Sequence, residues 1–181
     1  MSWDKYFFDL CETISTNSKC LSRKIGAIIV KDKTIISTGY NGPPREVPHC
    51  GERYVKDMNL YNKLYSDPKT HEMMYNNEIK KICPRKVLGF KSGEGLEYCI
   101  AGHAERNAIV NAARHGIAVK DATLYCNCPI PCTPCLIEII NSGIREVVVT
   151  DLEYYDIMGE WLVKQSGIKV RTFEGINKKG Y

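Results

Sequence analysis

The chain has 181 residues and a mass of 20.5 kDa, which predicts one domain large enough to bury its own core. Lysine and arginine total 25 against 21 acidic residues, and the resulting charge of +4 falls short of the basic stripe of a dedicated nucleic-acid-binding protein. It is compatible with an anionic small molecule as ligand. A composition of 44% hydrophobic and 25% charged residues argues against disorder and fibrous repeats.

Targeting signals and membrane spans are not expected. The longest strongly apolar run, Ile25 to Val30, is too short to cross a bilayer, and the N-terminus lacks the basic and apolar regions of a signal peptide. The nine cysteines are an odd number in a chain of this length without an export signal, which argues against a disulfide framework. Reduced cysteines that bind metal, in a cytoplasmic protein, are the better interpretation.

The first third of the chain predicts a helix and a hairpin. Apolar residues recur at steps of three and four from Trp3 to Ile14, which is typical of an amphipathic helix. Two β-rich runs, Ile25 to Val30 and Thr34 to Thr38, flank a polar turn and predict a hairpin. The glycines and prolines of Gly39 to Pro44 end it.

The rest of the chain predicts an irregular segment followed by alternating strands and helices. The irregular segment, at about 45–98, has helical candidates at Glu52 to Tyr65 and Glu72 to Ile82. After it the expected elements are helix Ala104 to Ala113, strand Thr123 to Cys126, helix Cys132 to Asn141, strand Val147 to Thr150, helix Ile157 to Gln165 and strand Ile168 to Phe173. This order indicates one three-layer α/β/α domain over 1–175 with a mixed five-stranded sheet. A polar tail follows at 176–181.

Two short motifs carry candidate metal ligands. His103-Ala104-Glu105 stands at the start of a predicted helix, and Pro131-Cys132-Thr133-Pro134-Cys135 enters another. Cysteines three apart near a helix start lie on one face, where the helix dipole favours the thiolate form that zinc needs. A histidine and two thiolates leave the fourth tetrahedral position for water, as in catalytic zinc sites, where zinc makes that water acidic.

Glu105 is two residues from a ligand and is placed to move protons between the water and a leaving amine. Taken alone, His103 is more simply a core or surface histidine, and the Cys-x-x-Cys pair could be a redox pair or half of a zinc ribbon. The combination is more specific, because His-x-Glu followed by Pro-Cys-x-x-Cys is the established signature of zinc-dependent nucleobase deaminases.

Over most of its length the sequence resembles the deoxycytidylate deaminases of the cytidine deaminase superfamily. Further matching segments are Lys24-Ile25-Gly26-Ala27-Ile28-Ile29-Val30, Gly39-Tyr40-Asn41-Gly42-Pro43-Pro44, Pro48-His49-Cys50, Ser92-Gly93-Glu94, Cys99, Asn107-Ala108-Ile109 and Ala112-Ala113-Arg114-His115-Gly116. The resemblance implies a cytidine deaminase-like fold and zinc-dependent conversion of dCMP to dUMP and ammonia, which supplies dUMP for thymidylate synthesis. One departure is Cys126-Asn127-Cys128, where the extra thiol of Cys128 could compete as a ligand. The segment Val55 to Ile79 is also longer than in many relatives.

The resemblance also implies substrate contacts. Asn41, otherwise a turn residue that tolerates positive φ, is expected to contact the sugar, and Ala104 the substrate. Arg23 and Lys24 are candidates for the phosphate, although surface cations need no such explanation. Tyr154 follows a predicted strand and could close on the nucleotide or simply pack.

Four further cysteines suggest a second, closed zinc site. Cys20, Cys50, Cys83 and Cys99 remain after the catalytic set, and buried thiols without a metal are their ordinary alternative. Relatives with a second zinc use matching positions, and His49 or His71 could substitute for one of the thiols.

Regulation is a last implication of the resemblance. Such enzymes are commonly homohexamers activated by dCTP with Mg²⁺ and inhibited by dTTP, which requires a second nucleotide site. Gly39, Tyr40 and Gly42 are candidates for it, and Arg114 for a subunit contact or, more simply, a helix cap. The alternatives to a dCMP deaminase are a deaminase acting on adenosine or cytosine in RNA and a non-catalytic zinc module for nucleic acid. The modest charge argues against the first, and Glu105 with a three-ligand set against the second.

Overall fold

A computed structural model describes residues 2–176 of the chain in two compact units. The first unit comprises the described residues up to Ser18, Ile25–Asn41 and the chain from His103 onward. The second unit comprises Lys19–Lys24 and Gly42–Gly102 and contains the segment expected to be irregular. The polar tail predicted at 176–181 lies, apart from Ile176, outside the described residues.

A mixed five-stranded sheet forms the centre of the first unit, as the sequence predicts. Its order is β2-β1-β3-β4-β5, and the strands are β1 (Gly26–Lys31), β2 (Thr34–Tyr40), β3 (Thr123–Cys126), β4 (Glu146–Val149) and β5 (Lys169–Thr172). Strand β1 pairs antiparallel with β2 and β3, whereas the pairs β3–β4 and β4–β5 are parallel. The parallel part brings the carboxyl ends of β3 and β4 to one edge, where sites in such folds are typically found.

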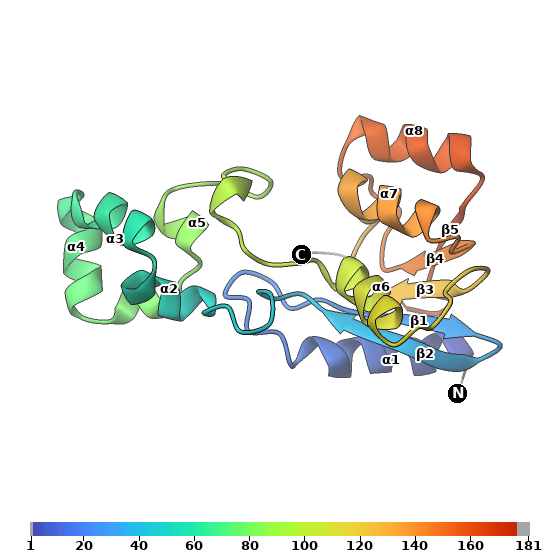
Figure 1. The fold of residues 1–181 in the computed structure, drawn as a ribbon. Coiled ribbons are helices and arrows are strands. Elements are labelled where there is room, and N and C mark those ends of the chain that lie inside the picture. Colours follow the sequence, from blue (N-terminus) through green and yellow to red (C-terminus); the bar gives the residue numbers. More distant parts are fainter. Residues whose placement is uncertain (1, 177–181) are drawn as a thin grey trace. The chain divides into compact units, whose positions relative to one another are not determined.

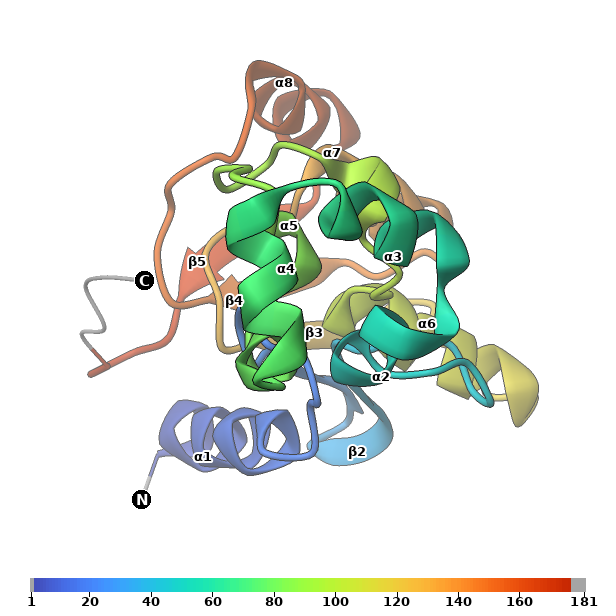
Figure 2. The same ribbon diagram turned by 90° about the vertical axis from the view of Figure 1, so that its left-hand side faces the viewer.

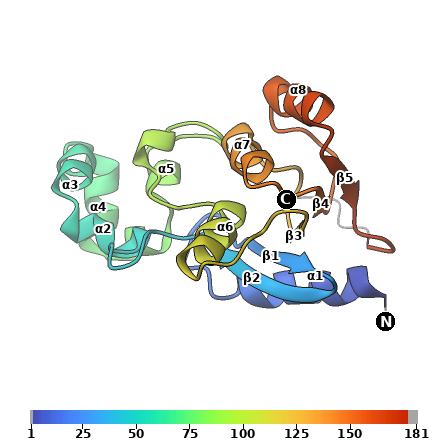
Figure 3. The ribbon, with the colours of Figure 1, turned by 45° about the vertical axis from the view of Figure 1, so that its right-hand side comes forward.

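Helices cover both faces of this sheet, which confirms the three-layer architecture (Figure 1). On one face α1 (Trp3–Ser15) packs Phe7 and Cys11 against Ile28 of β1. The other face is covered by α6 (Ala104–Arg114), α7 (Thr133–Asn141) and α8 (Ile157–Ser166). Figure 3 shows these three helices on one side of the sheet and α1 on the other. Because strand residues alternate between the faces, β3 supplies Tyr125 to one core and Cys126 to the other.

Gly39 explains the close packing of β2 on α6. A Cβ atom at this position would lie 2.3 Å from the carbonyl oxygen of Ala104 and 2.3 Å from the amide nitrogen of Ala108. Only glycine fits such an approach of strand to helix. The first turn of α6, which begins at the predicted His103-Ala104-Glu105 motif, is therefore held against the sheet by backbone contact.

Asn127 fixes the loop that leaves β3. Its side-chain oxygen accepts a 2.8 Å hydrogen bond from the amide of Gly26, and its side-chain nitrogen donates a 2.6 Å bond to Glu12 of α1. Its own amide donates to the carbonyl of Gly26. The loop between β3 and α7 is thus tied to the start of β1 before it reaches Cys132.

Short helices make up the second unit (Figure 2). They are α2 (Cys50–Lys56), α3 (Met58–Tyr65), α4 (Pro68–Tyr75), the 3₁₀ helix η1 (Glu78–Lys81), α5 (Pro84–Val87) and the 3₁₀ helix η2 (Leu96–Tyr98). A small core of Tyr54, Leu60, Leu64 and Ile79 stabilises them.

The two helices predicted in this segment are wrong in their extent. The expected helix Glu52 to Tyr65 is two helices, because Asp57 has an extended backbone and its side chain accepts a 3.1 Å hydrogen bond from the amide of Leu60, which starts a new helix. The expected helix Glu72 to Ile82 ends at Tyr75, because Asn77 adopts a left-handed conformation with φ of 58°. Neither break lies at a glycine or proline, the residues from which the sequence would predict it.

No helix among residues 2–176 is both long and apolar enough to span a membrane. No disulfide joins any of the nine cysteines, all of which lie in the described residues.

Candidate active site and metal centre

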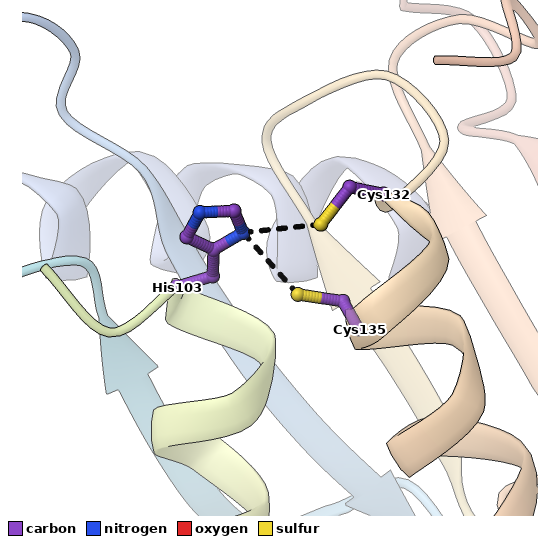
Figure 4. A group of neighbouring side chains, drawn as sticks. All are labelled: His103, Cys132 and Cys135. Atoms are coloured by element: carbon purple, nitrogen blue, oxygen red, sulfur yellow. Dashed lines mark hydrogen bonds between the residues drawn. The ribbon is translucent and has the colours of Figure 1, made fainter. Parts of the chain in front are cut away.

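Two helix N-termini of the first unit bring three metal-binding side chains together. His103 is the N-cap residue of α6, Cys132 is the N-cap residue of α7, and Cys135 lies in the first turn of α7. Nδ1 of His103 is 3.4 Å from Sγ of Cys132 and 3.3 Å from Sγ of Cys135. Figure 4 shows the imidazole and both sulfur atoms pointing toward one another.

The chemistry of this donor set fits zinc. The three ligand atoms all lie within 4.8 Å of one another, a spacing at which one ion can contact all three. One imidazole and two thiolates match the borderline-soft character of Zn²⁺, and three protein ligands leave a position open for water. The side chains that the sequence predicts as metal ligands are therefore the ones that the fold assembles.

Hydrogen bonds between the three side chains shift the pKa values of their donor groups. The pKa of the Cys132 thiol is lowered to about 4, first because Cys135 donates a hydrogen bond to it and also because His103 does. The pKa of Cys135 is raised, because its proton bonds to the Cys132 sulfur and the site is buried. The hydrogen bond to Cys132 raises the pKa of His103. The hydrogen bonds that lower the pKa of Cys132 favour its thiolate form, which is the form that binds a cation.

Glu105 lies buried next to these ligands. It is the second residue of α6 and only 4% exposed. Burial raises the pKa of its carboxyl group, while the nearby charge of His103 opposes this and that of Cys132 adds to it. A carboxyl group with a raised pKa holds its proton more readily than an exposed one, which suits a group that must accept and then donate a proton in general acid–base catalysis.

Two interactions that the motifs do not reveal hold α6 and α7 in place. Arg106 of α6 and Glu138 of α7 form a 2.8 Å ion pair between the helices that carry the ligands. At the start of α7, Thr133 donates a hydrogen bond to Asp156, which in turn caps α8 by accepting from the amide of Gly159. The sequence gives no local signal for either, because each joins residues far apart in the chain.

Cys128 does not join the predicted ligand set. It belongs to a different group, with Glu105 and Cys126, whose ligand atoms also lie within 4.8 Å of one another. Its Sγ is 3.0 Å from Sγ of Cys126. The expectation that Cys128 could compete with Cys132 or Cys135 is therefore not what the fold shows, because the loop after β3 turns Cys128 toward the sheet core.

The four cysteines predicted to hold a second zinc, Cys20, Cys50, Cys83 and Cys99, all lie in the second unit. Cys50 is buried, and burial raises the pKa of its thiol to about 11, with further contributions from the nearby charges of Cys20, Cys83 and Cys99. Among the described residues, these four thiols do not form a group whose ligand atoms all lie within 4.8 Å of one another, so the closed zinc site stays a prediction. The two histidines considered as substitutes lie in the same unit: His49 caps α2, and the ring of His71 packs edge-on against Tyr65 at 4.4 Å.

The residues expected to contact substrate have structural roles that the sequence did not reveal. The side-chain oxygen of Asn41 accepts a 2.8 Å hydrogen bond from the amide of Ile25, and its carbonyl accepts one from Ser18. Ala104 is fully buried, so a substrate contact there would use its backbone. Tyr154 packs against the core beneath α8. Their contacts with substrate stay predictions.

The phosphate and regulatory candidates are divided between the units. Arg23 and Lys24 belong to the second unit, where Arg23 donates a hydrogen bond to Ser92. Gly42 belongs there too and pairs with Gly102 through two backbone hydrogen bonds. In the first unit, the carbonyl of Tyr40 accepts a 2.8 Å bond from Asn107, and Arg114 lies exposed in the last turn of α6, where a cation is favourable. Gly39 serves the strand–helix contact described above.

Comparison of the sequence with known proteins finds a deaminase family model and several deoxycytidylate deaminases. A family model described as "Cytidine and deoxycytidylate deaminase zinc-binding region" matches residues 1–151. The chain is 33% identical to the deoxycytidylate deaminase of Saccharomyces cerevisiae over 95% of this chain and 45% of that protein. It is 31% identical to the deoxycytidylate deaminase of Enterobacteria phage T2, over 91% of this chain and 88% of the phage protein.

Solved structures share the fold. The dCMP deaminase of the cyanophage S-TIM5 in its apo form superposes with a TM-score of 0.60 at 22% identity, over 93% of this chain and 95% of that one. A second structure of that cyanophage enzyme, in complex with dCMP and dUMP, gives a TM-score of 0.59 at 23% identity, over 93% of this chain and 94% of that one. Among curated relatives, the chain spans 45% of the length of the S. cerevisiae protein and 44% of that of Schizosaccharomyces pombe.

Proposed function

Because the chain belongs to the cytidine and deoxycytidylate deaminase family, we propose that it hydrolyses the 4-amino group of dCMP to give dUMP and ammonia. The observation that carries the proposal is the convergence of His103, Cys132 and Cys135 beside the buried carboxyl group of Glu105. A closed structural zinc site would not place a buried acid next to an incomplete ligand set. The product would supply dUMP for thymidylate synthesis.

His103, Cys132 and Cys135 would hold the catalytic zinc, which when bound makes a water molecule acidic enough to attack at neutral pH. Glu105 would accept a hydrogen bond from the attacking water and take its proton as the C–O bond forms at C4 of the pyrimidine and the C4=N3 double bond opens onto N3. The same carboxyl group would give that proton to the amino nitrogen, and the C4–N bond would break with its electron pair leaving on ammonia. The C4=N3 bond would re-form at this point, and the remaining hydroxyl proton would move to N3 to give the uracil ring. The raised pKa of Glu105 suits a group that must alternate between the two protonation states.

Five residues are proposed to bind the nucleotide. Asn41 would contact the sugar and the backbone of Ala104 the base, because both lie in or next to elements that hold the first turn of α6. Arg23 and Lys24 would bind the phosphate as cationic donors, and Tyr154 would cover the nucleotide from the loop after β4. The support is the match of these positions to the family pattern.

We extend the proposal to a second, structural zinc held by Cys20, Cys50, Cys83 and Cys99. The support is that these thiols lie in one unit and that the other three influence the pKa of Cys50. A small core of four large side chains stabilises that unit, so a metal crosslink would add to its stability.

Regulation and assembly follow the same family pattern. We expect a homohexamer in the cytoplasm, activated by dCTP with Mg²⁺ and inhibited by dTTP, with Gly39, Tyr40, Gly42 and Arg114 near the effector site or a subunit contact. The exposed positions of Tyr40 and Arg114 are compatible with contacts to another molecule.

The test of the activity is a steady-state assay of ammonia release from dCMP, CMP, dCTP, deoxycytidine and an adenosine- or cytosine-containing RNA. We expect turnover of dCMP at the highest kcat/KM of the set. Turnover of the RNA alone would identify a nucleic-acid deaminase instead. Release of ammonia from none of them by zinc-loaded protein would overturn the assignment as an enzyme.

A further inference from the structure

A second group of metal-binding side chains lies beside the catalytic cluster. It consists of Glu105, Cys126 and Cys128, whose ligand atoms all lie within 4.8 Å of one another. The two sulfur atoms are 3.0 Å apart, and the three residues are 4%, 0% and 7% exposed. The predicted catalytic ligands do not include either thiol.

The fold places these three donors together by a simple arrangement. Cys126 is the last residue of β3 and Cys128 follows two positions later, so both side chains leave the chain on the same face of the sheet. Glu105 reaches the same layer from the first turn of α6. The intervening Asn127 points to the other side, where its bonds to Gly26 and Glu12 anchor the loop.

The character of the donors selects the ligand. Two thiols and one carboxylate suit a borderline or soft divalent cation such as Zn²⁺ or Cd²⁺, and not Mg²⁺ or Ca²⁺, which take oxygen ligands. Burial raises the pKa of Cys126 well above its usual value, which favours the protonated thiol when no cation is bound. A cation that binds there would displace this proton.

We propose that Glu105, Cys126 and Cys128 form an inhibitory site for a thiophilic divalent cation, distinct from the catalytic ligand set. Binding forms two metal–sulfur bonds and releases two thiol protons to the solvent, while the carboxylate of Glu105 becomes a ligand. A carboxylate held by a cation no longer carries protons between water and substrate. The inhibition rests on the proposed function; the binding does not.

The ordinary alternative is that both thiols merely fill the core beneath α6 and α7, where they pack with apolar residues. Cys11 provides a matched control for that alternative. It is equally buried, lies against the opposite face of the sheet, and donates a hydrogen bond to the carbonyl of Tyr125 at 3.4 Å. A serine at position 11 can keep that bond.

The experiment is a Cd²⁺ titration of the full-length, zinc-loaded protein under reducing conditions. Three readouts are followed together: the ultraviolet absorbance of new cadmium–thiolate bonds, zinc released into solution, and the rate of ammonia release from dCMP. The variants are Cys126→Ser, Cys128→Ser, Cys128→Ala and the control Cys11→Ser. Basal activity and thermal unfolding without cadmium show that each variant is folded.

We expect the wild type and Cys11→Ser to gain cadmium–thiolate absorbance and lose activity without releasing zinc. Loss of a group that only hydrogen-bonds a metal ligand already lowers metal affinity about 10–100-fold. Loss of a ligating sulfur in the Cys126 and Cys128 variants should therefore shift the inhibitory cadmium concentration upward by at least about 100-fold, with basal turnover retained.

Three results would overturn the proposal. The first is equal inhibition and equal absorbance in the wild type and in all Cys126 and Cys128 variants. The second is zinc release in proportion to bound cadmium, which would place the cation at the catalytic ligands. In the third, absorbance depends on Cys126 and Cys128 but turnover of dCMP is unchanged, so the site is not inhibitory. Because the absorbance is measured without substrate, a protein that does not turn over dCMP at all still reports on the binding.

Discussion

The position of Glu105 determines how its carboxyl group behaves. The residue lies in the first turn of α6, whose backbone approaches strand β2 closely at Gly39, and its side chain is buried. A glutamate at an exposed helix start would have an ordinary or lowered pKa, whereas burial here raises it. The burial of Glu105 thus accounts for the direction in which its pKa is shifted.

Replacement of Glu105 by glutamine is expected to reduce turnover of dCMP by at least about 10²–10⁴-fold, the usual contribution of a general acid–base group. The amide keeps the size of the carboxyl group but neither accepts nor gives up a proton near neutral pH. Zinc content, measured by elemental analysis, should stay that of the wild type, because His103, Cys132 and Cys135 are the ligands. Activity within tenfold of the wild type would remove Glu105 from the mechanism.

At the scale of single residues, the sequence predicts the metal ligands but not the side chains that pack next to them. Each of the two motifs lies at one helix start, so its spacing alone predicts the functional residues His103, Glu105, Cys132 and Cys135. The group of Cys126 and Cys128 with Glu105 depends on which way strand β3 faces and on how closely α6 approaches it. The orientation of β3 and the closeness of α6 result from tertiary packing, so no local sequence pattern predicts them.

The secondary-structure elements were predicted well where hydrophobic periodicity was strong. The five strands and the helices α1, α6, α7 and α8 lie within one or two residues of their expected bounds. In the second unit the apolar residues are sparse, and the helix breaks at Asp57 and Asn77 depend on capping and backbone conformation. Hydrophobic periodicity predicts neither the capping of a helix nor the backbone conformation at its end.

One ion-pair network joins the N-terminal helix to the far edge of the sheet. Arg171 of β5 bonds both carboxylate oxygens of Asp4 in α1, at 2.6 and 3.2 Å, and also contacts Glu146 of β4 at 3.1 Å. Burial would raise the pKa of Asp4, but the bonds from Arg171 and from the amide of Glu174 outweigh it and lower the pKa. A lowered pKa means that the ionised carboxyl group stabilises the folded state.

Replacement of Arg171 by glutamine is expected to lower the free energy of unfolding by about 1–3 kcal/mol at neutral pH, because it leaves the carboxylate of Asp4 without its charged partner. Because the pKa of Asp4 is lowered in the folded protein, its ionised carboxyl group stabilises the fold fully above the usual pKa of an aspartate. This stabilisation is lost as the pH falls through the lowered pKa. Urea denaturation at several pH values measures this.

The matched control is Lys5→Gln, which removes the exposed pair of Lys5 and Asp9 on the same helix. Exposed pairs contribute about 0–1 kcal/mol, so this variant should unfold nearly as the wild type does at every pH. An Arg171→Gln deficit that is small or does not shrink under acidic conditions would contradict the role of the network.

At the scale of the whole molecule, the described chain divides into one unit built on the central sheet and a second, helical unit. The sequence predicts the segment at about 45–98 as an insertion in a single domain; in the structure Gly42–Gly102 and Lys19–Lys24 form a compact unit together. Lys19–Lys24 precedes β1 in sequence, so its membership could not be read from local pattern. It brings Cys20 into the unit that holds Cys50, Cys83 and Cys99.

Protein purified without chelator is expected to hold two zinc ions per chain, one at each proposed site. Cys50→Ser should lose one of them and unfold at a lower temperature, because a structural zinc contributes directly to folding. Its turnover per remaining zinc should stay close to that of the wild type. Elemental analysis and thermal unfolding test this, with Cys11→Ser as the control for replacement of a buried thiol. A single ion in both proteins would exclude the second site.

Control by nucleotides would require more than one arrangement of the whole molecule. An effector changes the rate only if it binds one conformation more tightly than another, so dCTP and dTTP would have to favour different states. We therefore expect dCMP saturation to be sigmoidal without effector, hyperbolic with dCTP and Mg²⁺, and suppressed by dTTP.

Steady-state kinetics combined with analytical ultracentrifugation test this expectation, since cooperativity between sites requires an oligomer. Replacement of the exposed Arg114 by glutamate reverses the charge at the end of α6 and should weaken assembly or the response to effectors if that helix end is a subunit contact. The unassembled subunit should then saturate hyperbolically. Hyperbolic curves that neither triphosphate moves, from a wild-type protein that sediments as a monomer, would show that the chain is an unregulated deaminase and that Arg114 serves its own helix as a cap.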